Sequence, residues 1–218
     1  MHSFTEENYL KAIYKLQEAN GETVAPSELA KALAINAASV TDMMKKMAQK
    51  KLILYQKMKG VKLSEKGRQV AISIIRNHRL WEVFLVDKLG FRWDEVHDLA
   101  EQLEHIQSET LIHKLDAYLG HPKTDPHGDP IPDANGVFVK SKSVLLSSIN
   151  AGGHGKFTGV TDHSPAFLNY LDKVGLALGD AIKVAQVEEF DKSYTLLLKT
   201  KKEITVSFKV ANSLLVSG

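Results

Sequence analysis

The sequence predicts a mainly α-helical protein with a smaller β-rich part at its C-terminal end. Two observations lead to this prediction. Before residue 108, apolar side chains recur three and four residues apart, which is the spacing of amphipathic helices. After residue 143, short runs that favour strands alternate with glycine-rich and polar stretches. The segment 121–136 between the two parts holds four of the six prolines, so it is not expected to form a helix.

The composition is that of an ordinary folded chain. Its 218 residues are 44% hydrophobic and 25% charged, enough to bury a core in one or two domains. No apolar run approaches the roughly 18 residues that a membrane span needs, and the first residues lack the basic and apolar parts of a signal peptide. We therefore expect a cytoplasmic protein with no membrane partner. Because the chain has no cysteine, a bound metal would need imidazole and carboxylate ligands, which favours Mn(II), Fe(II) or a similar ion.

The first 63 residues predict three helices followed by a hairpin. An apolar stripe indicates a first helix over about 5–19. Pro26 favours the start of a short second helix, and a third helix begins at residues 37–39. Two strand-like runs then follow at residues 52–55 and 61–63.

Basic side chains concentrate in this part of the chain. Residues 1–80 carry 14 Lys and Arg against 7 Asp and Glu, and residues 41–80 carry 11 against 2. The charge alone is also compatible with a solvated helix face. Together with three helices and a basic hairpin, however, it predicts a winged helix-turn-helix that binds DNA, with the third helix in the major groove. The predicted DNA-contacting residues are Ser27, Asn36, Ala38, Ser39, Thr41, Asp42, Lys45, Lys46, Lys57, Lys59 and Lys62.

A set of histidines and glutamates follows at helical spacing. A long helix over about 64–89 carries one histidine and one glutamate a single turn apart, so both can reach one ion. Asp94 is expected to cap a further helix over about 95–108. Exposed charge pairs are the alternative interpretation, but no lysine or arginine lies between residues 93 and 113 to complete them. The candidate metal ligands on these helices are His78, Glu82, His97, Glu101, Glu104 and His105.

Several short motifs occur together in this chain. They are Asn8-Tyr-Leu-x-x-Ile-Tyr, Val40-Thr, Arg79-Leu-x-Glu82, Val96-His97-Asp98 and Leu103-Glu104-His105. In combination they resemble the diphtheria-toxin-repressor and manganese-transport-regulator family, and the resemblance covers essentially the whole chain. It implies a homodimer in which bound metal lets two winged domains meet a palindromic operator in double-stranded DNA and repress metal-uptake genes. It also implies a helical dimerisation domain and a C-terminal SH3-like domain of the FeoA type.

Carried over to this chain, the resemblance implies two metal sites. One site would use His78, Glu82 and His97. The other would use Glu104 and His105 together with Asn8 and Glu101. This second set is similar to the family pattern but departs from it at two positions.

The residues at positions 101, 8 and 11 bear on the choice of metal. Glu101 is similar to the manganese-type members, whereas iron-type members have cysteine there, so Mn(II) is favoured over Fe(II). Zn(II), Co(II) or Ni(II) could occupy the sites in vitro. Asn8 stands where the family has methionine or aspartate, and Lys11 replaces a ligand that the manganese-type members supply.

The proline-rich segment contains further candidate ligands. Asp125-Pro-His127-Gly resembles the segment that, in three-domain manganese-responsive members, supplies two ligands to a site shared with the glutamate at position 82. In those members an aspartate of the third domain completes the site. The matching residue here would be Asp162, and His163 is a further candidate. The alternative is a solvated aspartate and histidine in a turn.

The last 76 residues predict a small β-barrel of six or seven short segments. Strand-like runs lie at residues 181–187, 195–199 and 203–210, and a single helix is expected over 164–174. The predicted domains are therefore a winged helix-turn-helix at 1–74, a helical metal-binding and dimerisation domain at 75–140, and the SH3-like barrel at 141–218.

Two other classes of function stay open at this point. In a winged-helix regulator that responds to a small organic ligand, the histidines and glutamates would be structural and DNA binding would be indifferent to chelators. A metallohydrolase could use the same residue types to activate water. The sequence shows nothing that resembles a separate nucleophile or a glycine-rich phosphate loop, so an enzyme is not expected.

Overall fold

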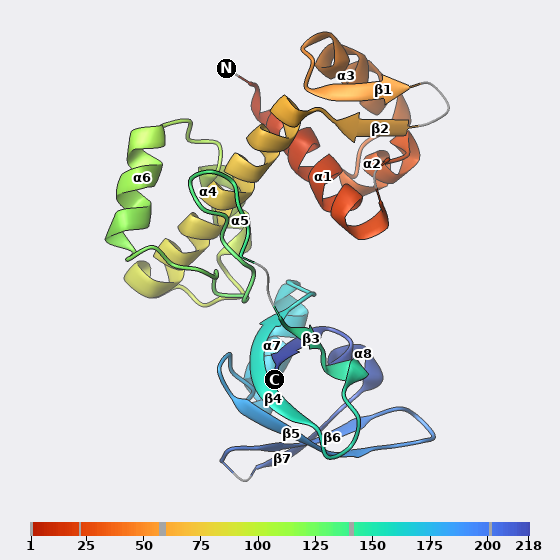
Figure 1. Ribbon diagram of the computed structural model, residues 1–218, viewed down its shortest axis with the longest axis vertical. Coiled ribbons are helices and arrows are strands. Elements are labelled where there is room, and N and C mark those ends of the chain that lie inside the picture. Colours follow the sequence, from red (N-terminus) through yellow and green to blue (C-terminus); the bar gives the residue numbers. More distant parts are fainter. Residues whose placement is uncertain (1, 22, 57–59, 140–141, 201) are drawn as a thin grey trace. The chain divides into compact units, whose positions relative to one another are not determined.

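The computed structural model describes residues 2–21, 23–56, 60–139, 142–200 and 202–218 (Figure 1). The chain divides into two compact units. Unit 1 comprises Met1–His78, Glu101–Ile112 and Pro132–Val137, and unit 2 comprises Arg79–Ala100, His113–Ile131 and Phe138–Gly218. Among the described residues, no helix is long and apolar enough to cross a bilayer.

Unit 1 begins with three helices, and side-chain caps set the starts of the first and the third. They are α1 (Phe4–Asn20), α2 (Pro26–Ala32) and α3 (Ala37–Gln49). The Ser3 hydroxyl accepts a hydrogen bond from the backbone N–H of Glu6, whose carboxylate accepts one from Ser3 in return. At the start of α3, the Asn36 side chain accepts from the backbone N–H of Ser39. These caps explain why the helices begin close to the predicted residues.

The hairpin completes this part of unit 1. Strands β1 (Ile53–Gln56) and β2 (Gly60–Leu63) pair in antiparallel fashion, and Val24 adds an isolated bridge to Val61. The core is formed by fully buried apolar side chains from all three helices and from the start of the hairpin. They include Leu10, Ile13, Leu29, Val40, Met44, Met47 and Leu52. The structure therefore confirms the winged helix-turn-helix, with two of the methionines of α3 packed in its core.

Three further helices follow the hairpin. They are α4 (Glu65–Leu89), α5 (His97–Leu103) and α6 (Glu109–Tyr118). Gly67 in the first turn of α4 allows a close approach, because a Cβ there would lie 2.0 Å from the Leu52 carbonyl oxygen. The long helix agrees with the prediction over 64–89.

The prediction of a helix over 95–108 was wrong at both ends. Asp94 does not cap α5, because its carboxylate accepts hydrogen bonds from Arg92 and Asn169 instead. At the other end, the Glu104 carbonyl accepts from the Asn77 side chain, at 3.2 Å, and the helix stops at Leu103. Both ends are therefore set by contacts with residues outside the helix.

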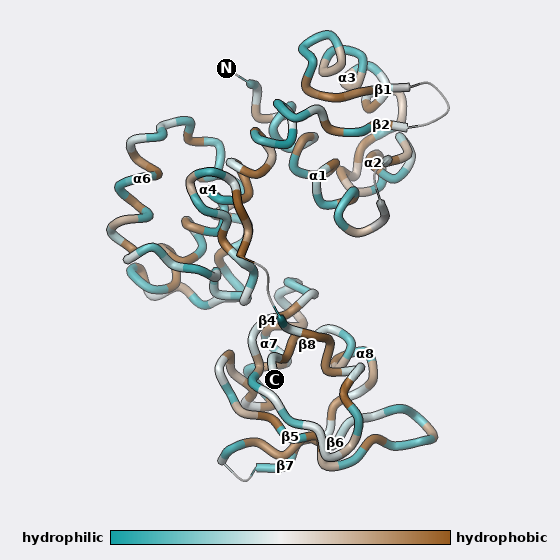
Figure 2. Tube along the Cα trace, viewed as in Figure 1, coloured by the Kyte–Doolittle hydropathy of each residue, from teal (hydrophilic) through white to brown (hydrophobic). Residues whose placement is uncertain are grey.

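The C-terminal part of unit 2 is a six-stranded antiparallel sheet. Its strands are β3 (Val144–Leu145), β4 (His154–Val160), β5 (Ala181–Val187), β6 (Tyr194–Leu198), β7 (Glu203–Val206) and β8 (Leu214–Ser217), in the order β3-β8-β4-β5-β6-β7. Helix α7 (Pro165–Val174) and the short helices η1 (Leu146–Ser148) and α8 (Phe208–Ala211) accompany it. Exposed and buried residues alternate over the first five residues of β5, and the buried Ile182 and Val184 belong to a core that contains Phe157 and Leu171; Figure 2 shows hydrophobic residues along the strands of this sheet.

Two expectations for this part need correction. The strand predicted over 203–210 ends at Val206, because the Ser207 side chain accepts from the backbone N–H of Val210 and starts α8. Helix α7 is consequently not the only helix after residue 143. The antiparallel sheet itself confirms the β-rich domain.

The proline-rich segment of unit 2 is irregular but ordered. Between Gly120 and Ile131 it forms no helix, as predicted. The carboxylate of Asp125 accepts hydrogen bonds from the backbone N–H groups of His127 and Asp129 and so holds a tight turn. Gly128 adopts φ +91°, and a Cβ there would lie 2.0 Å from the Thr158 carbonyl oxygen. The turn is therefore pressed against strand β4, and Asp125 and His127 are buried rather than solvated.

Candidate metal centre

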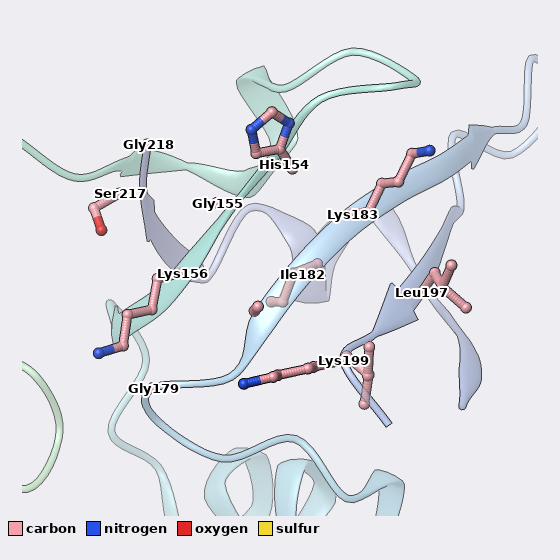
Figure 3. Close-up of a pocket in the computed structure, with 12 residues that line it drawn as sticks. His154, Gly155, Lys156, Gly179, Ile182, Lys183, Leu197, Lys199, Ser217 and Gly218 are labelled. Carbon is pink, nitrogen blue, oxygen red and sulfur yellow. The ribbon is translucent and has the colours of Figure 1, made fainter. Parts of the chain in front are cut away.

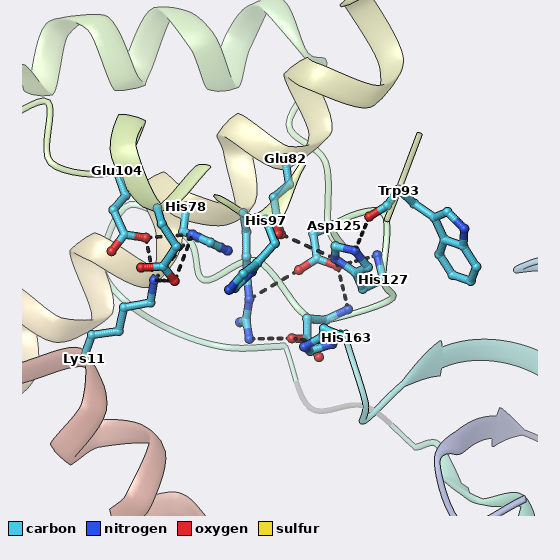
Figure 4. A network of polar contacts seen from close by, with 12 residues as sticks. Lys11, His78, Glu82, Trp93, His97, Glu104, Asp125, His127 and His163 are labelled. Carbon is cyan, nitrogen blue, oxygen red and sulfur yellow. Dashed lines mark hydrogen bonds and ion pairs between the residues drawn. The ribbon is translucent and has the colours of Figure 1, made fainter. Parts of the chain in front are cut away.

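One group of potential metal ligands lies entirely within unit 2. Glu82 comes from α4, and Asp125 and His127 come from the turn of the proline-rich segment (Figure 4). One ligand atom from each lies within 4.8 Å of the other two. All three residues are buried, with 2%, 6% and 2% of their surface exposed. Buried carboxylates need a charge partner, so this group requires a cation or protons.

The hydrogen bond of His127 fixes which ring nitrogen faces the carboxylates. Its Nε2 lies 2.8 Å from the backbone carbonyl oxygen of Trp93, and a carbonyl only accepts, so Nε2 carries the hydrogen. Its Nδ1 lies 3.6 Å from Glu82 Oε2 and 4.0 Å from Asp125 Oδ1. In the neutral ring, the lone pair of Nδ1 therefore lies on the side of the two carboxylates, where a metal ion held by all three residues could accept it.

The pKa values of His127 and Asp125 indicate that protons balance the charge of this group when no metal ion is bound. Burial lowers the pKa of His127, but the hydrogen bond and charge of Glu82 and the charge of Asp125 outweigh it and raise the pKa to about 9. Burial, reinforced by the charges of Asp129 and Glu82, raises the pKa of Asp125 to about 7. The metal-free group thus holds protons near neutral pH, and a divalent cation would displace them.

Neighbouring charged residues position this group. Arg79 Nε lies 3.6 Å from Asp125 Oδ2, and Arg79 Nη2 donates to Asp129 Oδ2 at 3.1 Å. His97, whose side chain is 39% exposed, places Nδ1 3.7 Å from Glu82 Oε1, whereas Oε2 is the oxygen that faces His127. Glu82 consequently lies between two histidines. Arg79 and the Trp93 carbonyl were not predicted as parts of this site, because only the fold brings them to the turn.

Two candidates from the third domain are placed differently. Asp162 Oδ1 accepts from the backbone N–H of Ser164, and this hydrogen bond lowers the pKa of the Asp162 carboxyl. His163 Nε2 lies 3.7 Å from Asp129 Oδ2, and its ring centroid is 5.0 Å from that of His127. Neither residue belongs to the three-residue group among the described residues. His163 nevertheless lies beside it.

A second cluster of buried charges lies entirely within unit 1. Lys11 Nζ donates to Glu101 Oε1 at 2.7 Å and to Glu104 Oε2 at 2.5 Å (Figure 4). His78 Nδ1 lies 2.7 Å from the same Glu104 oxygen. His105 Nδ1 lies 2.6 Å from Glu7 Oε2. The structure therefore gathers four of the predicted ligands around Lys11 and Glu7.

Glu7 was missed as a member of this cluster, although the sequence held one signal for it. Glu7 and Lys11 stand four residues apart on α1, on a face that is buried. Two charges at i and i+4 among buried apolar positions indicate partners elsewhere in the fold. Asn8, by contrast, is exposed.

The predicted DNA-contacting residues lie mostly on exposed surface of unit 1. Ser39, Lys45 and Lys46 are exposed on α3, on the side away from the buried Val40 and Met44. Thr41 donates to the Ala37 carbonyl, and Asp42 pairs with Lys45 at 3.3 Å. Ser27, Asn36 and Ala38 are exposed, whereas Lys62 is half-buried. Lys57 and Lys59 lie outside the described residues.

The sheet of unit 2 carries a separate cavity of about 630 Å³ (Figure 3). Its lining includes His154, Lys156, Lys183 and Lys199. Three ammonium groups around one cavity repel cations, so we assign no metal ion to it.

Comparison with known proteins gives one consistent result. The family model of the iron-dependent repressor N-terminal DNA-binding domain matches residues 1–61. The model of the metal-binding and dimerisation domain of the same repressors matches 64–133, and the FeoA domain matches 144–218.

Individual relatives agree with these matches. The iron-dependent repressor IdeR of Mycobacterium tuberculosis is 38% identical over 128 residues, which are 59% of this chain and 55% of that protein. The diphtheria toxin repressor of Corynebacterium diphtheriae is 31% identical over 142 residues, 65% of this chain and 62% of that protein. The aligned part thus spans little more than half the length of these curated relatives.

Solved structures match over nearly the whole chain. A manganese-dependent transcriptional repressor in complex with manganese has a TM-score of 0.87 and 33% identity, covering 98% of this chain and 99% of that one. The manganese regulator SloR has a TM-score of 0.75 and 31% identity, covering 97% of each chain.

Proposed function

Because the chain belongs to the iron-dependent repressor family, we propose that it is a metal-dependent repressor that binds operator DNA as a homodimer and controls metal-uptake genes. The observation that carries the metal dependence is the buried group of Glu82, Asp125 and His127, with His127 Nδ1 facing two carboxylates. The matches to the DNA-binding domain and to the metal-binding and dimerisation domain of these repressors support DNA binding and assembly as a homodimer. We propose domains at 1–74, 75–140 and 141–218, and action in the cytoplasm, where the operator would be.

We propose that Glu82, Asp125 and His127 are ligands of a divalent cation, with Asp162 and His163 as candidates to complete its coordination. His78 and His97 are the further ligands that the family pattern assigns beside Glu82. The ion would supply the positive charge that these buried carboxylates lack. A donor set of carboxylate oxygens and imidazole nitrogens without thiolate favours Mn(II) over Fe(II). One similar solved structure, a manganese-dependent transcriptional repressor in complex with manganese, supports this choice.

The chain's own residues prepare the site for an ion. The Trp93 carbonyl holds the His127 tautomer, and Arg79 with two backbone N–H groups orients Asp125. Binding of an ion to the ligands of α4 and of the turn would favour one arrangement of the chain over others. If that arrangement is the one that fits the operator, metal raises DNA affinity by selecting it.

The experiment that tests this function measures affinity for duplex DNA carrying a selected operator. Salt is kept fixed, because salt alone changes such affinities greatly. The protein is titrated with chelator present and then with Mn(II), Fe(II) and Zn(II) in turn. We expect a large gain in affinity with metal, and the gains rank the metals. Equal binding in chelator would instead support a winged-helix regulator that responds to an organic ligand.

Replacing Lys46 with alanine is expected to weaken binding to all duplexes by a similar factor. Lys46 is exposed on the proposed recognition helix, and a contact from it to a phosphate would release about one counterion. The slope of log affinity against log salt should fall by about 1. The matched control is Lys199→Ala, an exposed lysine in the turn after β6 of unit 2, which should leave the slope unchanged. An unchanged slope for Lys46→Ala removes this residue from the DNA interface.

Mn(II) affinity is expected to rise with pH between about 7 and 9. The pKa of His127 is raised to about 9, so this ring must lose a proton before Nδ1 can bind an ion. Each unit of pH below 9 should lower the affinity by up to about tenfold, and more steeply below 7, where Asp125 is also protonated. Calorimetric titrations at pH 6.5 and 7.5 in two buffers of different ionisation enthalpy measure the protons released. A pH-independent affinity with no proton release contradicts the assignment of His127.

A further inference from the structure

The cluster around Lys11 in unit 1 does not fit a second metal ion. It contains Glu101, Glu104 and His105, three of the four residues that the family resemblance assigns to such an ion. The space between the two carboxylates is already occupied by a cation. Lys11 Nζ lies 2.7 Å from Glu101 Oε1 and 2.5 Å from Glu104 Oε2, both within hydrogen-bonding distance.

The burial of these groups makes the pairing tight. Lys11 is 5% exposed and Glu104 is 1% exposed, whereas the Glu101 side chain is about one-third exposed. Away from water, a lysine and a glutamate are stable as charged groups only when paired. Glu104 Oε2 receives both the ammonium and His78 Nδ1, at 2.7 Å. Each partner therefore satisfies a charge that would otherwise be costly to bury.

An ammonium also excludes a metal ion from the same place. It carries three donors and no lone pair, so it cannot act as a ligand. An ion bound to the same two carboxylate oxygens would lie within a few ångströms of Nζ, where the two positive charges repel strongly at low local dielectric. The ammonium group of Lys11 thus neutralises the two carboxylates, as a metal ion does in a site of carboxylate ligands.

We propose that Lys11 is a built-in cation that takes the place of a metal ion between Glu101 and Glu104. The inference deepens the proposed function and rests on it. The chain then binds its regulatory metal only through the ligands around Glu82. The contact between α1 and the end of α5, which pairs residues 90 and 93 positions apart, is permanent and independent of metal.

The test counts Mn(II) ions per protomer by equilibrium dialysis followed by elemental analysis. Four full-length proteins are compared: the wild type, Glu101→Gln, Lys11→Glu and the double variant Lys11→Glu with Glu101→Gln. Glu101→Gln keeps the shape of a partly exposed side chain, so folding is expected to survive. We expect wild type and Glu101→Gln to bind the same number of ions. Lys11→Glu should bind one more, and the double variant should lose that additional ion.

A second readout covers the case in which Lys11→Glu folds poorly because three carboxylates meet. Its melting temperature in chelator should then lie below that of the wild type and rise on addition of Mn(II) by more than the wild-type value does. If Glu101→Gln binds one Mn(II) ion fewer than the wild type, the proposal that Lys11 takes the place of a metal ion is wrong. If Lys11→Glu gains neither an ion nor additional stabilisation by Mn(II), the inference is equally overturned.

The outcomes separate this inference from the proposed function. A wild type that binds no Mn(II) at all, or whose DNA affinity ignores metal, counts against the metal-dependent repressor. A gain of one ion in Lys11→Glu would still support the exclusion of metal by Lys11 in that case. If only Glu101→Gln loses an ion, the result contradicts the proposed role of Lys11 and leaves the proposal of metal-dependent repression in place.

Discussion

Replacing His127 with alanine is expected to lower Mn(II) affinity by roughly 100-fold or more and to abolish metal-dependent DNA binding. Changes to the partners of metal ligands already cost roughly 10- to 100-fold, so removal of a direct ligand should cost at least as much. The loss should be large here because His127 is the only imidazole in the three-residue group of the described residues. Calorimetric titration with Mn(II) and operator binding with and without chelator measure the two effects.

The controls for this variant distinguish a lost ligand from a lost fold. His154→Ala removes an exposed histidine from the sheet of the same unit and should leave both affinities unchanged. Glu82→Gln keeps the size of the side chain while removing a charge, and it should reproduce the loss of metal response with an intact circular dichroism spectrum. Full metal response in both His127→Ala and Glu82→Gln would refute the assignment of this metal centre.

Replacing Gly128 with alanine is expected to destabilise unit 2 by about 4 kcal/mol or more. The backbone there has φ +91°, which disfavours any Cβ, and the added Cβ would lie 2.0 Å from the Thr158 carbonyl oxygen and 2.4 Å from Gly159 Cα. Both contacts are with backbone atoms of β4, which cannot rotate away. Urea denaturation of the metal-free protein, followed by far-UV circular dichroism, measures the change in the free energy of unfolding.

A second glycine of the same unit provides the matched control. Gly152 has φ +88°, but an added Cβ would meet nothing within 4 Å. Gly152→Ala should therefore cost only the backbone strain, about 1–2 kcal/mol. The difference between the two variants isolates the close approach of the turn to β4. Equal losses in both would mean that the turn can move away from the strand without penalty.

The winged helix-turn-helix could be predicted from the sequence because its signals are local. Ser3 and Asn36 cap their helices through neighbouring residues, and Pro26 occupies the first turn of α2. The ends of α5 were predicted wrongly because distant residues fix them. Asn77, which holds the Glu104 carbonyl, comes from α4, and Asn169, which holds Asp94, comes from α7. No spacing pattern within the α5 segment encodes either contact.

The candidate site shows the same division. Glu82 and His127 could be named from residue type and from the resemblance, because both stand in short motifs. The burial of the turn could not, since it depends on the packing of Gly128 against β4. Lys11 was noticed as a departure from the family pattern, but its position between two glutamates depends on residues 90 and 93 positions away. Sequence patterns identify the donors, whereas the fold determines which cation they hold.

Glu82 turns one oxygen towards His97 and the other towards His127. If Glu82 is a ligand of the regulatory metal, as proposed, substitutions during evolution can therefore change metal affinity in two ways. Exchange of His97 would leave the buried group of Glu82, Asp125 and His127 in place, so the metal concentration at which the protein responds could change by degrees. Exchange of Glu82 or His127 would disrupt the buried group itself, so selection would meet a complete loss of metal response and no graded change in metal affinity.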